Sequence, residues 1–290
     1  MAHFDYVTVG HVTIDVLADL PSLDPRYPDA EGQRQPGGGA FYSALQAARL
    51  GLRTLIITRG IPREIEALLE PYRDELHLRV APAEHTTTLL TRGGGHARRQ
   101  QLLAWAGPIA APAELDTAIL HLAPIARETP RTFSGRADFV GLTPQGLVRR
   151  WEERGAITTG ALNRALLPER YDAVVLSASE LAGCAELLPV AGGQLVAVTS
   201  GAQPTAIHVP GGAPLRVPAS PIAGPRDDLG AGDVFAAAFF VALHEGLDPK
   251  AAGTLATAAA AVRIAGVGPH AIGDRQAVLA QLSQPPVPRR

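Results

Sequence analysis

The segment with the clearest potential for chemistry is Asp-Asp-Leu-Gly-Ala-Gly-Asp at residues 227–233, which joins a Pro/Gly-rich loop to a long apolar segment. The turn of Gly230, Ala231 and Gly232 opens a helix, so successive backbone N–H groups can converge where the helix dipole is positive. Such a turn can bind an anion. Asp233 follows in the first helical turn, where it is either a general base beside this anion hole or simply a helix cap.

Two other segments place an acidic residue or glycines where a ligand could bind. Asp15 stands in an apolar stretch, where a carboxylate is costly unless it has a partner, so it is either a ligand contact or a residue at a turn or sheet edge. Gly37, Gly38 and Gly39 precede a helix that is expected to end at Gly51. They form either a flexible turn or a place where a ligand reaches the backbone closely.

The composition excludes several classes of function. The 290 residues are 46% hydrophobic and carry a net charge of -2 without a basic tract, so we expect no nucleic acid and no other polyanion as a partner. The N-terminus lacks a signal-peptide pattern, and no uninterrupted apolar stretch of about 18 residues precedes the Ala-rich C-terminal helices, which predicts a cytoplasmic protein without a membrane span. The single cysteine, Cys184, allows no intrachain disulfide and no cysteine metal cluster, and we expect it to fill the core.

Lys250 is the only lysine in the chain. P-loop NTPases and protein kinases both place a lysine on the nucleotide phosphates, and Gly-x-x-x-x-Gly-Lys is absent here. The glycines at 93–95 precede a strand rather than a helix, so we do not expect them to form a phosphate loop. If the protein binds ATP, it does so through backbone amides, arginine and a metal ion.

Short apolar, β-rich runs alternate with helical or polar segments along most of the chain, which predicts a parallel sheet covered on both faces. The alternation breaks at 84–106, where two β-rich runs flank a glycine turn and predict an inserted β-hairpin. The expected strands are 4–10, 13–20, 53–58, 77–80, 86–90, 98–105, 118–122, 138–142, 173–176 and 195–199. The expected helices are 40–50, 62–69, 234–244 and 249–266, the last two being apolar enough to be buried.

Ligands of parallel α/β sheets bind beyond the carboxyl ends of the strands, so polar residues and glycines after these runs are candidates for binding. The candidates are Gln145, Ser177, Glu180, Thr199 and Gly201. Glu180 can also be a capping residue, because Ser177 three residues earlier completes the pattern of a capping box at a helix start.

The Gly-Ala-Gly-Asp turn before a buried helix, near the C-terminal end of a βα chain, resembles the signature of the PfkB/ribokinase family of sugar, polyol and nucleoside kinases. The block from Gly37-Gly38 to Ala48-Arg49-Leu50-Gly51 is similar to the family's first signature. The resemblance implies one ribokinase-like α/β domain over residues 1–290, with a central mostly parallel sheet, helices on both faces and a small β-sheet lid. The lid segments would be about 12–20, 33–36 and 84–106. Arg98-Arg99-Gln100 resembles a run found on that lid.

The resemblance also implies roles at the acceptor side of the site. Asp15 would accept hydrogen bonds from acceptor hydroxyls, the pair Gly37 and Gly38 would touch the acceptor, and Gln145 would lie in the same binding site. Tyr42 stands where many members carry an asparagine that contacts the sugar. Because an aromatic ring offers a flat partner to the C–H surface of a ring, we expect an inositol or hexose as acceptor ahead of ribose.

At the donor side, the resemblance places Ser177-x-x-Glu180 where the family has Asn-x-x-Glu, which organises Mg²⁺ and phosphate. Glu180 would hold Mg²⁺ directly or through water. The residues that would contact the nucleotide are Ser177, Glu180, Thr199, Gly201 and Thr257, with His270 as either a further contact or a solvated loop residue.

The implied activity is transfer of the γ-phosphoryl group of ATP, with Mg²⁺, to a hydroxyl of a small polyhydroxy acceptor. Asp233 would be the general base, and Gly230 to Gly232 would form the anion hole. A monomer or a homodimer through the lid is expected. One alternative is a non-catalytic ligand-binding protein, because the chain departs from the family pattern at Tyr42, Ser177, Asp228 and Leu229. Another alternative is a Rossmann oxidoreductase, but this chain lacks the Gly-x-Gly-x-x-Gly that such an enzyme carries after its first strand.

Overall fold

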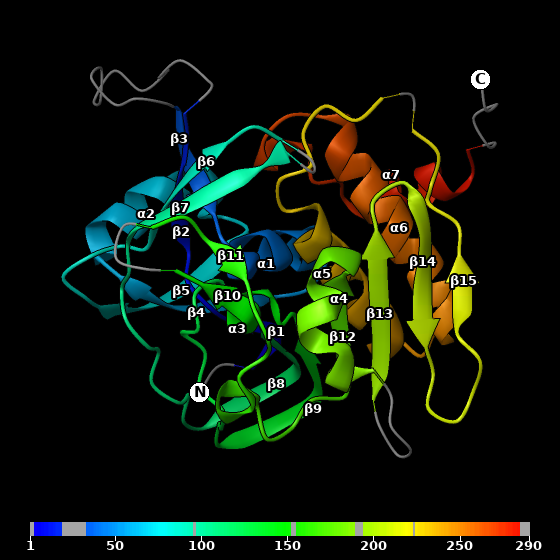
Figure 1. The fold of residues 1–290 in the computed structure, drawn as a ribbon, viewed down its shortest axis with the longest axis horizontal. Coiled ribbons are helices and arrows are strands. Elements are labelled where there is room, and N and C mark those ends of the chain that lie inside the picture. Colours follow the sequence, from blue (N-terminus) through cyan, green and yellow to red (C-terminus); the bar gives the residue numbers. More distant parts are fainter. Residues whose placement is uncertain are drawn as a thin grey trace.

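The computed structural model describes residues 3–18, 33–94, 97–151, 155–188, 194–222 and 224–284. These residues form a nine-stranded sheet, a four-stranded sheet that we call the small sheet, and a two-stranded ribbon (Figure 1). Helices lie on both sides of the large sheet. The small sheet stands apart from it, at the upper left of Figure 1.

The nine-stranded sheet has the order β15-β14-β13-β12-β9-β8-β1-β4-β5. All strands from β13 to β5 are parallel, whereas β14 and β15 are antiparallel additions at one edge. The strands are β1 Phe4–Val9, β4 Thr54–Gly60, β5 Leu76–Pro82, β8 Leu115–Leu122, β9 Gly135–Leu142, β12 Ala173–Ser177, β13 Leu195–Ser200, β14 Gln203–His208 and β15 Leu215–Val217. The predicted fold class, an α/β chain with a mostly parallel central sheet, is confirmed.

Both faces of this sheet are buried because successive side chains of a strand point to opposite sides. On β1, Tyr6 belongs to the core on one face, whereas Val7 and Val9 belong to the core on the other. The helices are α1 Gly39–Arg49, α2 Pro62–Leu69, α3 Gln145–Val148, α4 Ala178–Cys184, α5 Ala231–His244, α6 Pro249–Ala265 and α7 Arg275–Leu282. Single 3-10 turns span Glu70–Tyr72, Arg164–Leu166, Ala185–Leu187 and Pro269–Ala271.

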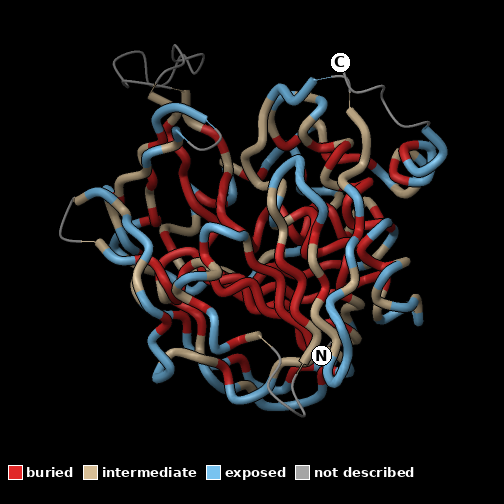
Figure 2. Tube along the Cα trace, turned by 45° about the vertical axis from the view of Figure 1, so that its right-hand side comes forward, coloured by how far each residue is buried: buried red, intermediate tan, exposed pale blue. Residues whose placement is uncertain are grey.

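Helices α5 and α6 are buried, as their apolar composition predicts. Every residue of α5 from Val234 to Ala242 is buried, and the helix packs closely along the alanine-rich α6. Figure 2 shows this buried interior, with the exposed residues confined to the periphery. Helix α6 begins where expected, because the Asp248 side chain accepts hydrogen bonds from the N–H groups of Lys250 and Ala251.

Cys184 is buried in the core, which confirms its predicted role.

The small sheet has the order β3-β2-β6-β7. Its strands are β3 Gln33–Gly37, β2 Thr13–Leu17, β6 Thr88–Arg92 and β7 Arg99–Ala104. Strands β6 and β7 are antiparallel, so the hairpin predicted in 84–106 is confirmed. Strand β2 lies between β3 and β6, which makes Asp15 a residue of an inner strand rather than of a turn or sheet edge. Residues 19–20, which the sequence predicts to be extended, lie outside the described residues.

The structure also contains strands that the sequence pattern does not predict. Strands β14 and β15 lie in a segment rich in Gly and Pro, and β15 has only three residues. The ribbon of β10 Arg149–Arg150 and β11 Thr158–Thr159 contains no apolar residue, so it gives no hydrophobic signal. Within the described residues, no helix is both long and apolar enough to span a membrane.

Candidate active site

The loop before α5 has the glycine-dependent geometry that the sequence predicts. Gly230 is the N-terminal cap of α5 and has a positive φ of 77°, which L-residues with a side chain rarely adopt. A β-carbon at this position would also lie 2.3 Å from the ring of Tyr42. Gly232 differs, because a β-carbon there would meet nothing within 4 Å. The protein therefore needs glycine at 230 for its own fold, whereas space remains open over Gly232.

An ion pair between α6 and the loop fixes the shape of this turn. Arg263 is fully buried, and its Nη2 donates to Asp227 Oδ2 at 2.7 Å and to the carbonyl of Leu229 at 2.7 Å. Asp227 also accepts hydrogen bonds from the N–H groups of Leu229 and Gly268, both at 2.9 Å. Burial raises the pKa of Asp227, but the Arg263 and backbone N–H bonds outweigh it and hold the pKa below its usual value. The sequence analysis included Asp227 in its segment without giving it a role, and it missed Arg263, whose signal was an arginine inside an apolar helix.

Asp233 lies in the first turn of α5, where part of the residue is exposed but its carboxyl group is enclosed by the protein. Burial is the largest effect on its carboxyl group and, with the negative charges of Glu180 and Asp15, raises the pKa to about 7, against the opposing charge of Arg149. The carboxylate sits against the start of α1, because a β-carbon on Gly39 would lie 2.8 Å from Asp233 Oδ1. An aspartate with this pKa can take up a proton near neutral pH.

Asp15 is buried at 2% exposure and lies directly over the second glycine segment. Its Oδ1 accepts a hydrogen bond from Thr13 Oγ1 at 2.7 Å, and a β-carbon on Gly37 would lie 2.2 Å from its Oδ2. Burial raises the pKa of Asp15 to about 6, while Thr13 and the charges of Arg149 and Arg98 oppose the rise. Gly38 has a φ of 91° and precedes α1. The structure thus brings Asp15 together with the predicted Gly37–Gly38 turn.

Tyr42 lies in α1, but its ring is not an open surface. The side chain is 1% exposed, packs against Gly230 and lies under the guanidinium of Arg263, 5.7 Å from the ring centroid. The expected flat partner for an acceptor ring is therefore covered. The hydroxyl differs, because it is buried and makes no well-formed hydrogen bond within the described residues, although the guanidinium of Arg263 is close enough to interact with it. Burial, followed by the charge of Asp15, raises the Tyr42 pKa and outweighs the opposing effect of Arg263, so the hydroxyl stays protonated and interacts with both groups.

Glu180 realises the capping arrangement and also faces the site. The N–H of Ser177 donates to Glu180 Oε2 at 2.8 Å, and the Ser177 hydroxyl bonds the hydroxyl of Ser179 at 2.8 Å. The charge of Glu180 nevertheless acts on both Asp233 and Arg149. Among the described residues, no group of three or more His, Cys, Asp or Glu side chains is placed to hold a metal ion.

Arg149 is a site residue that the sequence prediction missed. Its side chain is buried, with Nη1 donating to the carbonyl of Ile125 at 3.1 Å and Nη2 to Gln100 Oε1 at 2.7 Å. Its charge interacts with Glu180, Asp15 and Asp233. Gln145, the predicted residue, begins α3 four positions earlier and is half-buried. Gln145 and Arg149 therefore lie at opposite ends of α3, and only Arg149 has a charge that interacts with the carboxylates.

Glu128 is a second missed residue and is fully buried. Its carboxylate accepts hydrogen bonds from the N–H groups of His11, Ile125 and Ala126, at 2.6 to 3.1 Å. These bonds join the segment after β1 to the segment after β8. They also fix the backbone whose Ile125 carbonyl holds Arg149.

The predicted nucleotide-contacting residues are only partly brought together. Ser177 and Thr199 are partners in the register of β12 and β13, and Gly201 lies in the exposed turn that follows, with a φ of 55°. The Thr257 hydroxyl donates to the carbonyl of Thr254 at 2.9 Å within α6. His270 is exposed and its ring lies 5.4 Å from that of Tyr72, beyond the end of α1 that is remote from Gly39.

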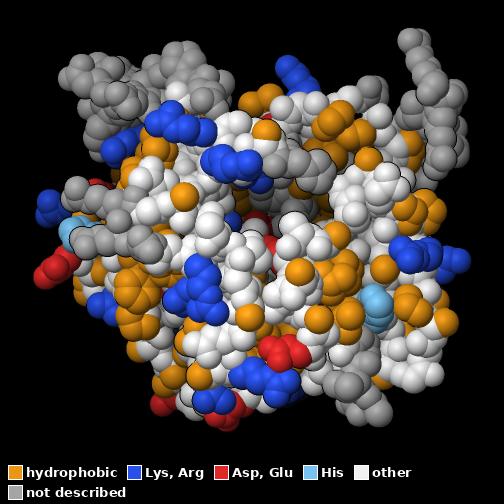
Figure 3. All heavy atoms as spheres, in the orientation of Figure 1, with side chains coloured by type: hydrophobic (Ala, Val, Ile, Leu, Met, Phe, Trp, Pro, Cys, Tyr) orange, Lys and Arg blue, Asp and Glu red, His pale blue; other side chains and the backbone are white. Residues whose placement is uncertain are grey.

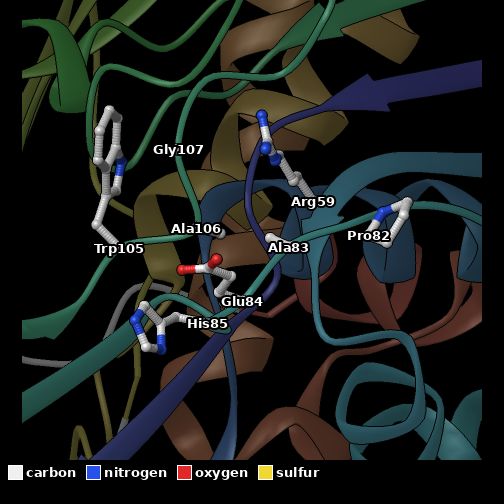
Figure 4. A pocket seen from close by; sticks show the side chains of 8 residues that line it. All are labelled: Arg59, Pro82, Ala83, Glu84, His85, Trp105, Ala106 and Gly107. Atoms are coloured by element: carbon white, nitrogen blue, oxygen red, sulfur yellow. The ribbon is translucent and has the colours of Figure 1, made fainter.

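Figure 3 shows a hollow near the centre of one face, with acidic and basic side chains at its bottom. A separate cavity of about 490 Å³ lies where the small sheet joins β4 and β5, and its side chains include Arg59, Glu84, His85 and Trp105 (Figure 4). None of the site carboxylates, Asp15, Glu180 and Asp233, lines this cavity.

A mostly parallel α/β sheet with a separate small sheet is the arrangement of the ribokinase-like fold that the sequence resemblance implies. The model of the pfkB family of carbohydrate kinases matches residues 150–272, which include Glu180 and the Gly-Ala-Gly-Asp turn. The predicted resemblance to the PfkB/ribokinase family is thereby confirmed, and it indicates a phosphotransferase. Among curated proteins, none matches this sequence.

Solved structures share the fold over nearly the whole chain. Arabidopsis thaliana ribokinase, complexed with ribose and ATP, has a TM-score of 0.72 and 22% identity, covering 98% of this chain and 100% of that one. A pyrophosphate-dependent kinase of the ribokinase family, complexed with a pyrophosphate analogue and myo-inositol, has a TM-score of 0.71 and 19% identity, covering 95% and 99%. Methanocaldococcus jannaschii nucleoside kinase has a TM-score of 0.68 and 18% identity, covering 96% and 98%.

Proposed function

We propose that this protein is an ATP-dependent kinase that phosphorylates a hydroxyl of a small sugar, polyol or nucleoside, with Asp233 as the general base. The observation that carries the proposal is the Asp233 carboxyl group, whose pKa is raised to about 7 directly after the Gly-Ala-Gly turn at the start of α5. General bases work best when their pKa lies near the working pH. A carboxylate that only capped a helix would gain nothing from this shift, because its charged form is the one that caps.

The acceptor would bind between the small sheet and α1. Asp15, on an inner strand, would accept hydrogen bonds from acceptor hydroxyls over Gly37 and Gly38, where no side chain intervenes. The Tyr42 hydroxyl, which makes no well-formed hydrogen bond within the described residues, interacts with this carboxylate and would gain a partner from the acceptor. Gln145 would contribute from the start of α3. This arrangement suits a molecule with several neighbouring hydroxyls.

The turn of Gly230, Ala231 and Gly232 would stabilise the transferred phosphoryl group through backbone N–H groups at the positive end of α5. The open space over Gly232 supports this role, because a phosphoryl group could approach the backbone there. Arg263 and Asp227 would preserve the turn without contacting the substrate. On the donor side, Ser177, Thr199, Gly201 and Thr257 would contact the nucleotide.

Glu180 fits a role in holding Mg²⁺, because Ser177 engages only its Oε2 and a site with one carboxylate is typical of Mg²⁺ bound mainly through phosphates and water. When bound, Mg²⁺ would neutralise charge on the donor phosphates. The small sheet would act as a lid that excludes water, so that the phosphoryl group passes to the acceptor rather than to water.

The proposal is tested by incubating the protein with Mg²⁺-ATP and a panel of ribose, hexoses, myo-inositol and nucleosides while ADP formation is followed. Pyrophosphate is included as a second donor because a protein of the same fold depends on it. We expect acceptor-dependent ADP formation that is lost in Asp233→Asn. Binding of an acceptor without turnover by the parent, with either donor, would instead support a non-catalytic ligand-binding protein.

A further inference from the structure

Arg149 is a buried arginine whose charge is not neutralised by an ion pair within the described residues. Its side chain is buried, yet no ion pair joins it to any carboxylate of the residues that the structure describes. Its two hydrogen bonds within the described residues go to neutral acceptors, the Ile125 carbonyl and Gln100 Oε1. A guanidinium carries five N–H donors, so three remain for another partner. Buried charges are normally paired, which makes this arrangement costly unless an anion binds.

The charges around Arg149 indicate where that anion would lie. Its charge interacts with Glu180, Asp15, Asp233 and Glu128, in that order, and its hydrogen bonds tie it both to the small sheet at Gln100 and to the segment after β8 at Ile125. The three site carboxylates would repel a phosphate. Arg149 is the one arginine whose charge acts on all three of these described carboxylates, and Lys250, the only lysine, lies at the start of α6, remote from them in the fold.

Two supports hold the guanidinium in place. The Ile125 carbonyl belongs to backbone that Glu128 fixes through the N–H groups of Ile125 and Ala126. Gln100 belongs to β7 of the small sheet, and its Nε2 donates to Thr91 on β6 at 3.1 Å. The second support therefore comes from the element that would close over the substrates.

We propose that Arg149 binds the phosphoryl group during its transfer, and that Gln100 of the small sheet positions the Arg149 guanidinium for this contact. This inference rests on the proposed kinase function. In the reaction, the acceptor oxygen forms a bond to the γ-phosphorus, its proton passes to Asp233, and the bond to the bridging oxygen breaks so that ADP leaves with the electron pair. Arg149 would offset the charge on the non-bridging oxygens together with the N–H groups of the Gly-Ala-Gly turn. Closure of the small sheet would then complete the site and exclude water in one motion.

Arg149→Met and Arg149→Lys test the first part, with the adjacent exposed Arg150→Met as the matched control. Loss of a phosphate-binding donor typically lowers kcat about a hundredfold to a thousandfold, so we expect at least a hundredfold loss in Arg149→Met and a smaller loss in Arg149→Lys. The KM for the acceptor should change less than about threefold. Binding of ADP alone should persist, whereas the tighter binding of ADP with tetrafluoroaluminate, which imitates the transferred group, should be lost.

Gln100→Leu tests the positioning role. We expect a kcat loss of about tenfold with an unchanged acceptor KM, and no further loss when Gln100→Leu is added to Arg149→Met, because the two act through one contact. Additive losses would overturn the positioning role.

Three results would overturn the role of Arg149. These are an Arg149→Met enzyme within about threefold of the parent, a loss confined to the acceptor KM, or unchanged tetrafluoroaluminate binding. If Arg149→Met does not fold, Arg149→Lys decides by the same readouts. A parent that phosphorylates no acceptor with either donor would instead refute the kinase function itself, whatever the variants bind.

Discussion

Arg263 and Asp227 form a largely buried ion pair that ties α6 to the loop before α5, with 2.7 Å between Arg263 Nη2 and Asp227 Oδ2. Arg263 is fully buried and also holds the Leu229 carbonyl, so this pair determines the backbone path into the Gly-Ala-Gly turn. Within the described residues, the hydrogen bonds of Arg263 all go to Asp227 and Leu229 of the loop. We infer that it acts through the backbone and has no direct contact with substrate.

Arg263→Met should therefore reduce stability strongly, because Asp227 would keep its charge without its partner. Removing one member of a buried pair typically costs about 3 to 5 kcal/mol. Asp227→Asn should be at least as costly, because it leaves the fully buried Arg263 charged without its counterion, whereas Asp227 is partly exposed to water. An amide oxygen can still accept from the N–H groups of Leu229 and Gly268, so the turn itself should keep its shape. Urea unfolding of both variants measures the two losses, and either variant as stable as the parent would contradict the prediction.

Asp233→Asn is expected to lower kcat by at least roughly a thousandfold while ATP binding remains nearly unchanged, because the change removes the base and leaves the backbone amides in place. The raised pKa also predicts a stability effect. Between the unfolded pKa near 3.8 and the folded value of about 7, the folded state binds more protons than the unfolded state, so stability falls as pH rises through this range. At pH 8 the variant should melt no lower than the parent. Activity within tenfold of the parent would exclude Asp233 as the base.

The pH dependence of kcat/KM follows from the same carboxyl group. The base must be deprotonated, so kcat/KM should fall as the pH drops below about 7. Glu180 and Asp15 raise the Asp233 pKa and Arg149 lowers it, while the buried Tyr6 hydroxyl stays neutral because burial raises its own pKa. Titrating kcat/KM between pH 5 and 9 tests this. Because the charge of Arg149 lowers the Asp233 pKa, the acid limb should move to higher pH in Arg149→Lys if the lysine charge lies farther from Asp233. A flat profile down to pH 5 would contradict the assignment.

The sequence predicts the fold well because its strands are separated by glycine, proline and capping residues whose effects are local. Gly51 and Asp248 end and begin helices where expected, and Pro62 opens α2. Arg149 and Arg263 could not be predicted in this way, since their partners lie 24 to 49 residues away and leave no periodic signal. Glu128 bonds the nearby Ile125 and Ala126, but its link to His11 spans 117 residues. The candidate site was therefore predicted from its glycines and its carboxylates, whereas the cations that face or support them became visible only in the structure.

Glu180→Gln separates the metal-holding role from the capping role. An amide oxygen can still accept the Ser177 N–H, so the helix start should survive, but a neutral side chain holds Mg²⁺ less well. We expect the Mg²⁺ concentration for half-maximal activity to rise more than the acceptor KM. Loss of the Glu180 charge should also lower the apparent pKa of Asp233, since Glu180 raises it. An unchanged Mg²⁺ titration would leave only the capping role.

Tyr42 offers the sharpest test of acceptor recognition, because its two parts make different predictions. Its ring packs on Gly230 and is covered, whereas its hydroxyl is buried without a well-formed hydrogen bond among the described residues and interacts with Asp15. Tyr42→Phe keeps the packing and removes this hydroxyl, so stability should stay equal or rise. If the hydroxyl binds the acceptor, the acceptor KM should rise about fivefold to tenfold with little change in kcat.

Tyr42→Asn is the companion variant, because asparagine stands at this place in many relatives of the resembling family. It removes a ring from the core and should be less stable than Tyr42→Phe by about 2 kcal/mol or more. Its paired hydrogen-bonding groups should change the order of kcat/KM among ribose, a nucleoside, a hexose and myo-inositol. Because the ring is covered, stacking no longer argues for a hexose or inositol ahead of ribose, and the test rests on the change of order alone. An identical order in parent and both variants would show that Tyr42 only supports the Gly230 turn.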